Sequence, residues 1–234
     1  MSLHFDNTVL NTISCGAGTA TAVGSGAYTM VALVLTGTFN TNSGIVVGYL
    51  SGSAERSLLI DTGQLFGEGF DPGFGTLTTA NWYWAGISKT AGSQQQRFHL
   101  APYVSSGSFT WSHGTSSANV HGDHSPLDEF RIGDGNSRAN LDMAAMAVFT
   151  SALSDLQIET ACSRLASDLQ AASPSAFWTM PLANGTNPLV DLTGGGANEN
   201  SRTAGITASA DPPSYSFSLS QASPKGGQFL AFFS

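Results

Sequence analysis

Short apolar runs alternate with clusters of Gly, Asn, Ser and Asp along most of the chain. Runs of this kind, bounded by turn-forming residues, predict β-strands. The predicted strands cover residues 3–10, 27–36, 44–51, 56–61, 81–89, 96–104, 127–132 and 140–150. Short strands at this spacing, with few helical patterns between them, indicate an all-β sandwich or jelly roll.

Two of these segments also indicate which faces are buried. Residues 28–35 are apolar on both faces of a strand, which places that strand in the middle of a sheet. Residues 81–89 alternate, with Trp82 and Trp84 on one face and Tyr83 on the other. Alternating aromatic residues on a strand usually fill the space between two sheets, so we expect most tryptophans to lie in the core.

One segment follows a helical period instead. Ser154 is a natural N-cap, and Gln157 three residues later completes a capping box. An apolar stripe then recurs at Ile158, Cys162, Leu165 and Leu169. Ser173-Pro174 ends the pattern. The sequence therefore predicts one short helix, with one face on a sheet and the other in water.

No repeat or linker divides the chain, so residues 1–219 are predicted to form one jelly-roll domain with an N-terminal strand. Residues 220–234 are predicted to be a flexible Ser-Pro-Lys-Gly-Gly hinge followed by an aromatic tail. Four large apolar residues gather in this tail, namely Phe229, Leu230, Phe232 and Phe233. They would be exposed unless the tail folds back or docks into another chain, and both alternatives stay open.

Cys15 and Cys162 are the only cysteines. Two cysteines in a chain of this size do not make a disulfide framework. Cys162 also falls on the inward stripe of the predicted helix. We therefore expect buried free thiols, with a Cys15–Cys162 pair as the alternative.

Composition limits the classes of function. Hydrophobic residues make up 41% of the chain, enough for a core, but charged residues only 10%, against about 25% in typical soluble domains. The net charge is −8, and the eight basic residues are scattered, so no basic face for nucleic acid is expected. The longest apolar run, residues 28–35, is far shorter than the ~20 residues of a membrane span. Residues 1–10 have no signal-peptide pattern, so we expect synthesis in the cytoplasm without secretion.

The order of motifs in the second half carries a resemblance. Ile132-Gly133 is followed by a strand of small residues, Ala144 to Phe149, and then by Leu153-Ser154 at the start of the helix. A DLTGGG turn comes later. This order resembles the laminin-G-like, concanavalin A-like jelly-roll family, over residues 25 to 210. The resemblance implies a two-sheet antiparallel sandwich whose helix covers an open end or edge.

No catalytic set is visible. The jelly-roll glucanases of this superfamily use paired acids, whereas the five glutamates here are isolated from one another. Asp128-Glu129 is the only adjacent acidic pair, and neighbours on a strand point to opposite faces. No nucleophile elbow and no phosphate or dinucleotide fingerprint occurs. We assign no catalytic residue and expect a protein that is not an enzyme.

The densest polar cluster is SHGTSSANVHGDH, which begins at residue 112. Its spacing matches no named metal motif, so we expect a solvated loop and assign no metal site. If a metal binds here, the candidate ligands are His121, Asp123 and His124, with His113 nearby. The resemblance adds calcium as a candidate cofactor, because acidic loops of laminin-G-like domains often hold it. Asp123, Asp128 and Asp134 are the residues concerned.

Trp111 lies in a polar segment and is the candidate residue for stacking on a sugar ring. A carbohydrate-binding module or adhesin that recognises cell-surface glycan is therefore the main alternative function. A glycoside hydrolase or lyase is a third, since fold alone does not settle function.

We expect a non-enzymatic structural protein of a tailed-phage virion. The resemblance is to laminin-G-like domains found as capsid decoration or minor tail proteins. Capsid decoration is favoured because the chain has no coiled-coil or fibre repeats. The expected partners are the major capsid or tail proteins and further copies of this chain in a homo-oligomer, and the expected location is the virion. No nucleic acid or membrane partner is expected.

Overall fold

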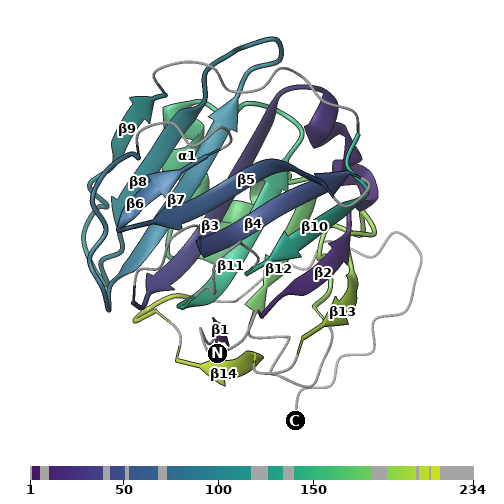
Figure 1. Ribbon diagram of the computed structural model, residues 1–234. Helices are drawn as coiled ribbons and strands as arrows, with labels where there is room; N and C mark the ends of the chain where they lie inside the picture. Colours follow the sequence, from purple (N-terminus) through teal and green to yellow (C-terminus); the bar gives the residue numbers. More distant parts are fainter. Residues whose placement is uncertain are drawn as a thin grey trace.

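The computed structural model contains two antiparallel sheets packed face to face (Figure 1). The predicted all-β, two-sheet antiparallel jelly-roll sandwich is therefore confirmed. The structure describes residues 2–5, 11–38, 43–50, 53–67, 73–116, 126–133, 140–180, 189–203, 206–210 and 212–216. The proposed hinge and aromatic tail, residues 220–234, lie outside these ranges.

The larger sheet has eight strands in the described part of the chain. In spatial order they are β14 (Ile206–Ser209), β1 (Ser2–Phe5), β11 (Leu141–Phe149), β3 (Tyr28–Thr36), β7 (Trp82–Lys89), β8 (Arg97–Pro102) and β9 (Ser112–Thr115), with β12 (Ala176–Thr179) also paired to β11. Strand β3 lies between β11 and β7, as its apolar pattern predicts.

The smaller sheet has six described strands. Their order is β13 (Glu199–Arg202), β2 (Ile13–Gly16), β10 (Glu129–Ile132), β4 (Ser43–Leu50), β5 (Ser53–Asp61) and β6 (Gln64–Phe66). The 3₁₀ helix η1 (Gly18–Ser25) follows β2. Strands β2, β6 and β9 and helix η1 are not among the predicted elements. Of the strand predicted over residues 3–10, the structure describes β1 as far as Phe5, and residues 6–10 lie outside the described ranges.

The core between the sheets is filled by alternate residues of each strand. On β7, Tyr83, Ala85 and Ile87 belong to this core, while Trp84 points to the other side of the sheet. The predicted alternation is therefore confirmed, but the expectation that these tryptophans fill the space between the sheets is wrong, because Trp82 and Trp84 belong to the cluster on the outer face. Trp178 is fully buried in the same core and donates its indole N–H to the Ala197 carbonyl oxygen at 2.8 Å.

A second apolar cluster lies on the outer face of the eight-stranded sheet. Two short helices, α1 (Asp155–Ala161) and α2 (Ala166–Ala171), cover the central strands there. The buried side chains from the sheet and the helices include Val31, Leu33, Trp84, Ala145, Ala147, Phe177, Ile158, Cys162 and Leu169. The expectation that the helix covers an end or edge of the sandwich is wrong, because the apolar surface that needs cover is the middle of this face.

The single predicted helix is in fact two. Residues 163–165 leave the helical path because the Ser163 hydroxyl accepts a hydrogen bond from the Leu165 N–H at 2.8 Å and donates one to Asp168 Oδ2 at 2.6 Å. Local hydroxyl bonds of this kind compete with helix formation. Leu165, assigned to the buried stripe by its spacing, is consequently 45% exposed. The capping box of Ser154 and Gln157 is present.

Cys15 and Cys162 are both free and buried. Cys15 lies in the core between the sheets, whereas Cys162 lies under the helices on the other side of the eight-stranded sheet. Burial raises the pKa of both thiols, so they remain protonated and pack as small apolar side chains.

The Ile-Gly step at the end of β10 has a local cause. Gly133 has a φ of 75°, and a Cβ there would meet the ring of Phe5. Only glycine fits both conditions. Of the described helices, none has the length and apolar character to cross a bilayer.

Candidate functional site

The predicted site residues fall largely outside the described ranges. His121, Asp123, His124 and Asp134 do so, and so do the tail residues Phe229, Leu230, Phe232 and Phe233. Trp111 is described and is partly buried against the outer apolar cluster. Asp128 is described and exposed.

The described polar groups that converge lie elsewhere, on strands β8 and β9 and helix α1. Strand β8 alternates, so Phe98 points into the sandwich core while Arg97 and His99 point to the outer face. His113 on β9 is directly opposite His99 in the register of the two strands. The capping box at Ser154 starts α1 just above these strands, which brings the carboxylate of Asp155 over both imidazoles.

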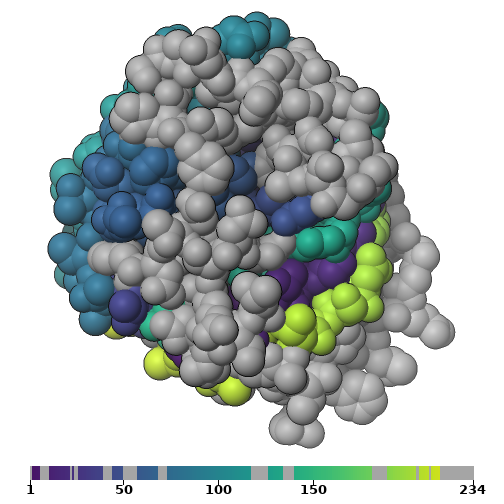
Figure 2. All heavy atoms as spheres, in the orientation of Figure 1, coloured from purple at the N-terminus to yellow at the C-terminus, as the bar shows by residue number. Residues whose placement is uncertain are grey.

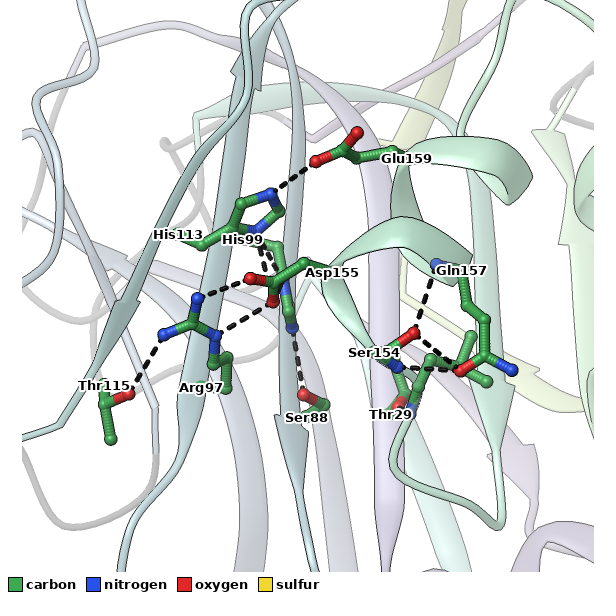
Figure 3. Close-up of polar contacts among 11 residues, drawn as sticks. Thr29, Ser88, Arg97, His99, His113, Thr115, Ser154, Asp155, Gln157 and Glu159 are labelled. Atoms are coloured by element: carbon green, nitrogen blue, oxygen red, sulfur yellow. Dashed lines mark hydrogen bonds and ion pairs between the residues drawn. The ribbon is translucent and has the colours of Figure 1, made fainter.

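Figure 3 shows the resulting contacts. His99 Nδ1 and His113 Nδ1 are 2.9 Å apart, and Asp155 Oδ1 is 3.6 Å from each of these nitrogens. Arg97 forms a fork on the carboxylate, with Nε donating to Oδ1 at 2.9 Å and one terminal nitrogen donating to Oδ2 at 2.5 Å. A two-bond fork of this type fixes the carboxylate plane.

The far nitrogen of each imidazole is also occupied. His99 Nε2 is 2.9 Å from the Ser88 hydroxyl, and His113 Nε2 is 3.0 Å from Glu159 Oε1. The ring of Trp111 stacks on that of His113, with centroids 5.8 Å apart and an interplanar angle of 5°. One face of this tryptophan is therefore covered by an imidazole.

Burial and charge set the protonation of the group. Burial, with a smaller contribution from the His113 imidazole, lowers the pKa of His99 to about 4, so this ring is neutral at pH 7. The hydrogen bonds from Arg97 hold the pKa of the Asp155 carboxyl below its usual value. At neutral pH, the group thus offers neutral imidazole at His99 beside an ionised carboxylate.

The pair of Ser88 and His99 does not form an accessible nucleophile. Ser88 is only 4% exposed and lies on β7 beneath the imidazole. A serine nucleophile must reach the substrate carbonyl. In this position, the hydroxyl orients the ring of His99 and does not face solvent.

A second polar group lies at the opposite edge of the eight-stranded sheet, in an open hollow of ≈ 670 Å³. Asp142 on β11 contacts His4 Nδ1 at 2.5 Å, and its other oxygen accepts a hydrogen bond from the Ser209 hydroxyl at 2.5 Å. Here the carboxylate lies between the serine and the histidine. In a catalytic triad the imidazole has the middle place, so this arrangement joins β1, β11 and β14 without activating the serine.

No family model matches the chain, and no curated protein matches it. The solved structures similar to it include the native heptameric SAP-like pentraxin of Limulus polyphemus, at a TM-score of 0.44 and 15% identity over 70% of this chain and 82% of that one. A mutant of Trypanosoma rangeli sialidase is similar at a TM-score of 0.42 and 16% identity, over 57% of this chain. The match covers only 22% of that sialidase chain. At these values the likeness concerns the β-sandwich alone.

The sequence holds part of the signal for the site. Arg97 and His99 are two apart in a predicted strand, which places them on one face. The residues that complete the group, Asp155 and Glu159, are one helical turn apart at the start of the predicted helix. Of the residues in this group, the pattern of polar residues indicates only His113, and it places His113 near His121, Asp123 and His124.

Proposed function

We propose that this chain is a non-enzymatic structural protein of a tailed-phage virion, and that it decorates the capsid. The observation that carries the proposal is that each face of the eight-stranded sheet is packed against another layer. The six-stranded sheet covers one face, and helices α1 and α2 cover the middle of the other. Interactions with a partner are then left to the sheet edges, the loops, the terminal segments and the outer face of the six-stranded sheet.

The state of the polar side chains supports the same proposal. The hydroxyl of Ser88 is buried under His99, and the carboxylate of Asp142 is held between His4 and Ser209. Both groups join strands to one another. Buried polar groups that are hydrogen-bonded in this way rigidify a fold.

The proposed contact with the capsid is the aromatic tail at Phe229, Leu230, Phe232 and Phe233, which lies outside the described residues. A segment with four large apolar residues of this kind would gain from docking into a groove of a neighbouring protein. The low charge of the chain, 10% of its residues, is compatible with close packing of many copies on one surface.

Immunogold electron microscopy of purified particles tests this function. An antiserum raised against the purified chain should label the capsid shell, and mass spectrometry of the same particles should detect the chain. Label on the tail of the phage particle would assign the chain to the minor tail proteins instead. Absence of the chain from purified particles would overturn the proposal.

A binding assay on particles that lack the chain tests the tail residues. Purified chain should bind these particles, and a Phe232→Ser, Phe233→Ser variant should not. Trp111→Phe is the matched control, since it changes an aromatic residue of the sandwich and should leave binding intact. Equal binding by the tail variant would exclude docking through these residues.

One observation favours glycan recognition as a second candidate. The ring of Trp111 is only partly buried and lies beside the polar side chain of His113. Aromatic rings next to polar groups are common in sugar sites. A glycan array, run with and without calcium, should then show binding that Trp111→Ala removes and Trp111→Phe keeps. Failure of the wild-type chain to bind any glycan would exclude this candidate.

A further inference from the structure

We propose that His99, His113 and Asp155 bind a divalent transition-metal ion, and that Zn²⁺ is the preferred one. Two imidazole nitrogens and one carboxylate oxygen, each from a different element, point to a common centre (Figure 3). This combination of donors is typical of zinc and is disfavoured by calcium and magnesium, which take oxygen ligands. The proposal is independent of the virion function.

The distances fit an ion of that size. The three donor atoms form a triangle with sides of 2.9, 3.6 and 3.6 Å. The point equidistant from its corners lies about 2.0 Å from each donor atom, which matches Zn–N and Zn–O bonds of about 2.0–2.2 Å. The three atoms therefore need little movement to bind, and they leave a fourth position for water.

The surrounding residues orient each ligand. Glu159 accepts from His113 Nε2 at 3.0 Å, which leaves the Nδ1 lone pair of that ring directed at the centre. The Ser88 hydroxyl can accept a hydrogen bond from His99 Nε2–H as readily as it can donate one to Nε2. A ring that binds the ion through Nδ1 carries its one proton on Nε2, and the Ser88 hydroxyl then accepts the hydrogen bond from that N–H. The neutral ring binds without release of a proton.

Arg97 does not block the carboxylate. A carboxylate has about four lone-pair positions, and the fork of Arg97 uses two of them. Ligating carboxylates are ordinarily hydrogen-bonded to a neighbouring group, which fixes their orientation. Arg97 is therefore a positioning residue for Asp155.

The centre is reachable from the molecular surface, and an ion bound there would connect two strands to a helix. The side chain of His99 is fully buried, while those of His113 and Asp155 are 12% and 37% exposed, so the ion can enter from the surface. Once bound, it connects β8, β9 and α1. Helix α1 is only seven residues long, so a bond to the sheet at its first turn fixes it on the outer face.

Isothermal titration calorimetry with ZnCl₂ tests the site, using the full chain after treatment with a chelator. We expect one equivalent of Zn²⁺ to bind, a higher Tm with Zn²⁺ than with chelator, and no such response to CaCl₂. Asp155→Asn and His113→Gln should abolish binding. Glu159→Gln, which changes an exposed side chain, should weaken binding by about 10- to 100-fold while leaving the Tm in chelator unchanged.

Two controls separate this site from others. His4→Gln changes a histidine that pairs with the Asp142 carboxylate but belongs to no three-ligand group among the described residues, and it should leave Zn²⁺ binding intact. A His121→Gln, His124→Gln variant should do the same. Loss of binding in that variant, or equal binding by wild type and His113→Gln, would overturn the proposal, as would failure of the wild type to bind. If His113→Gln does not fold, the proposal is overturned by a Glu159→Gln variant that binds Zn²⁺ with unchanged affinity.

Discussion

The two outer faces of the sandwich differ in character. On the eight-stranded sheet, the outer face presents Val31, Leu33, Trp84 and Ala147, and helices cover them. On the six-stranded sheet, strands β10, β2 and β13 lie side by side at the molecular surface (Figure 2). There, Arg131 of β10 pairs with Glu129 at 2.9 Å.

The difference explains why a β-protein of this kind has helices. A sheet that is apolar on both faces must bury both. On the six-stranded sheet, the outer side carries the ion pair of Arg131 and Glu129 at β10, while Val47 of β4 and Leu59 of β5 are only 3% and 5% exposed. Strand β3 is apolar on both faces, and helices α1 and α2 supply the second cover. At the margin of that cover, the helix start contributes Asp155 and Glu159, which meet the two buried or half-buried imidazoles.

Trp84→Ala should have the largest effect on stability. The side chain is 1% exposed, donates its N–H to the Ser163 carbonyl oxygen at 3.2 Å, and packs edge-on against the ring of Tyr215. Its removal takes away the contact between the sheet and the turn that joins the two helices. We expect a loss of about 3–5 kcal/mol in the free energy of unfolding, measured by urea denaturation.

The matched change on the other outer face is Arg131→Ala. Arg131 is 33% exposed, pairs with the partly exposed Glu129 and lies over the ring of Tyr49 at 4.0 Å, so its loss should cost about 1 kcal/mol. Equal losses from Trp84→Ala and Arg131→Ala would contradict the contrast between the two faces.

Ala147→Leu should have the next largest effect. Ala147 is fully buried under the helices and is paired with Phe177 and Val31 on its two sides. Three added carbon atoms have no space there, so the helices must shift. The expected loss is about 1–3 kcal/mol, again from urea denaturation. The control is Leu156→Ala. Leu156 of α1 is 72% exposed, so this change should alter stability by less than about 0.5 kcal/mol.

The longer strands of the fold can be predicted from the sequence, because burial leaves a pattern in each of them. Strands β3 and β7 show it most clearly, and both lie where the pattern puts them. Strand β9 carries no such signal. Its sequence, SHGT, has no large apolar residue, and it is a strand because its backbone pairs with β8.

The site depends on how the strands pair, which leaves no pattern in the sequence of either strand. His99 and His113 meet only because β8 pairs with β9 in one register, and neither the pairing nor the register is visible in a single sequence. The break between α1 and α2 is similar. Helical spacing continues through Leu165, but the hydrogen bonds of the Ser163 side chain end the helix before it.

Ser154→Ala tests the start of the cover over the eight-stranded sheet. The Ser154 hydroxyl caps α1 by accepting from the Gln157 N–H, and the Gln157 side chain accepts from the Ser154 N–H at 2.9 Å. Loss of this cap should cost about 1 kcal/mol, measured by thermal and urea unfolding. Ser154→Asp retains an acceptor and should restore most of that loss. If Ser154→Asp is as unstable as Ser154→Ala, the cap is not the cause.

Glu129→Gln, on the outer side of β10, should have the smallest effect and a distinct pH dependence. Burial by itself raises the pKa of the Glu129 carboxyl, but hydrogen bonds from Arg131 and Ser14 outweigh it and hold the pKa below its usual value. Because the folded pKa is the lower one, the unfolded chain takes up this proton first as the pH falls. The stabilisation is thus complete above the unfolded pKa of about 4.3 and is lost as the pH falls through the folded pKa.

Wild type should therefore exceed Glu129→Gln in stability by under about 1 kcal/mol at pH 7, and the difference should vanish in acid. Urea denaturation across pH 2–7 measures this difference. In an Arg131→Ala background it should shrink, since the main partner of the carboxylate is gone. If the stability difference is the same at every pH, the amide side chain disturbs packing. Packing, and not the ion pair, would then determine stability on this part of the six-stranded sheet.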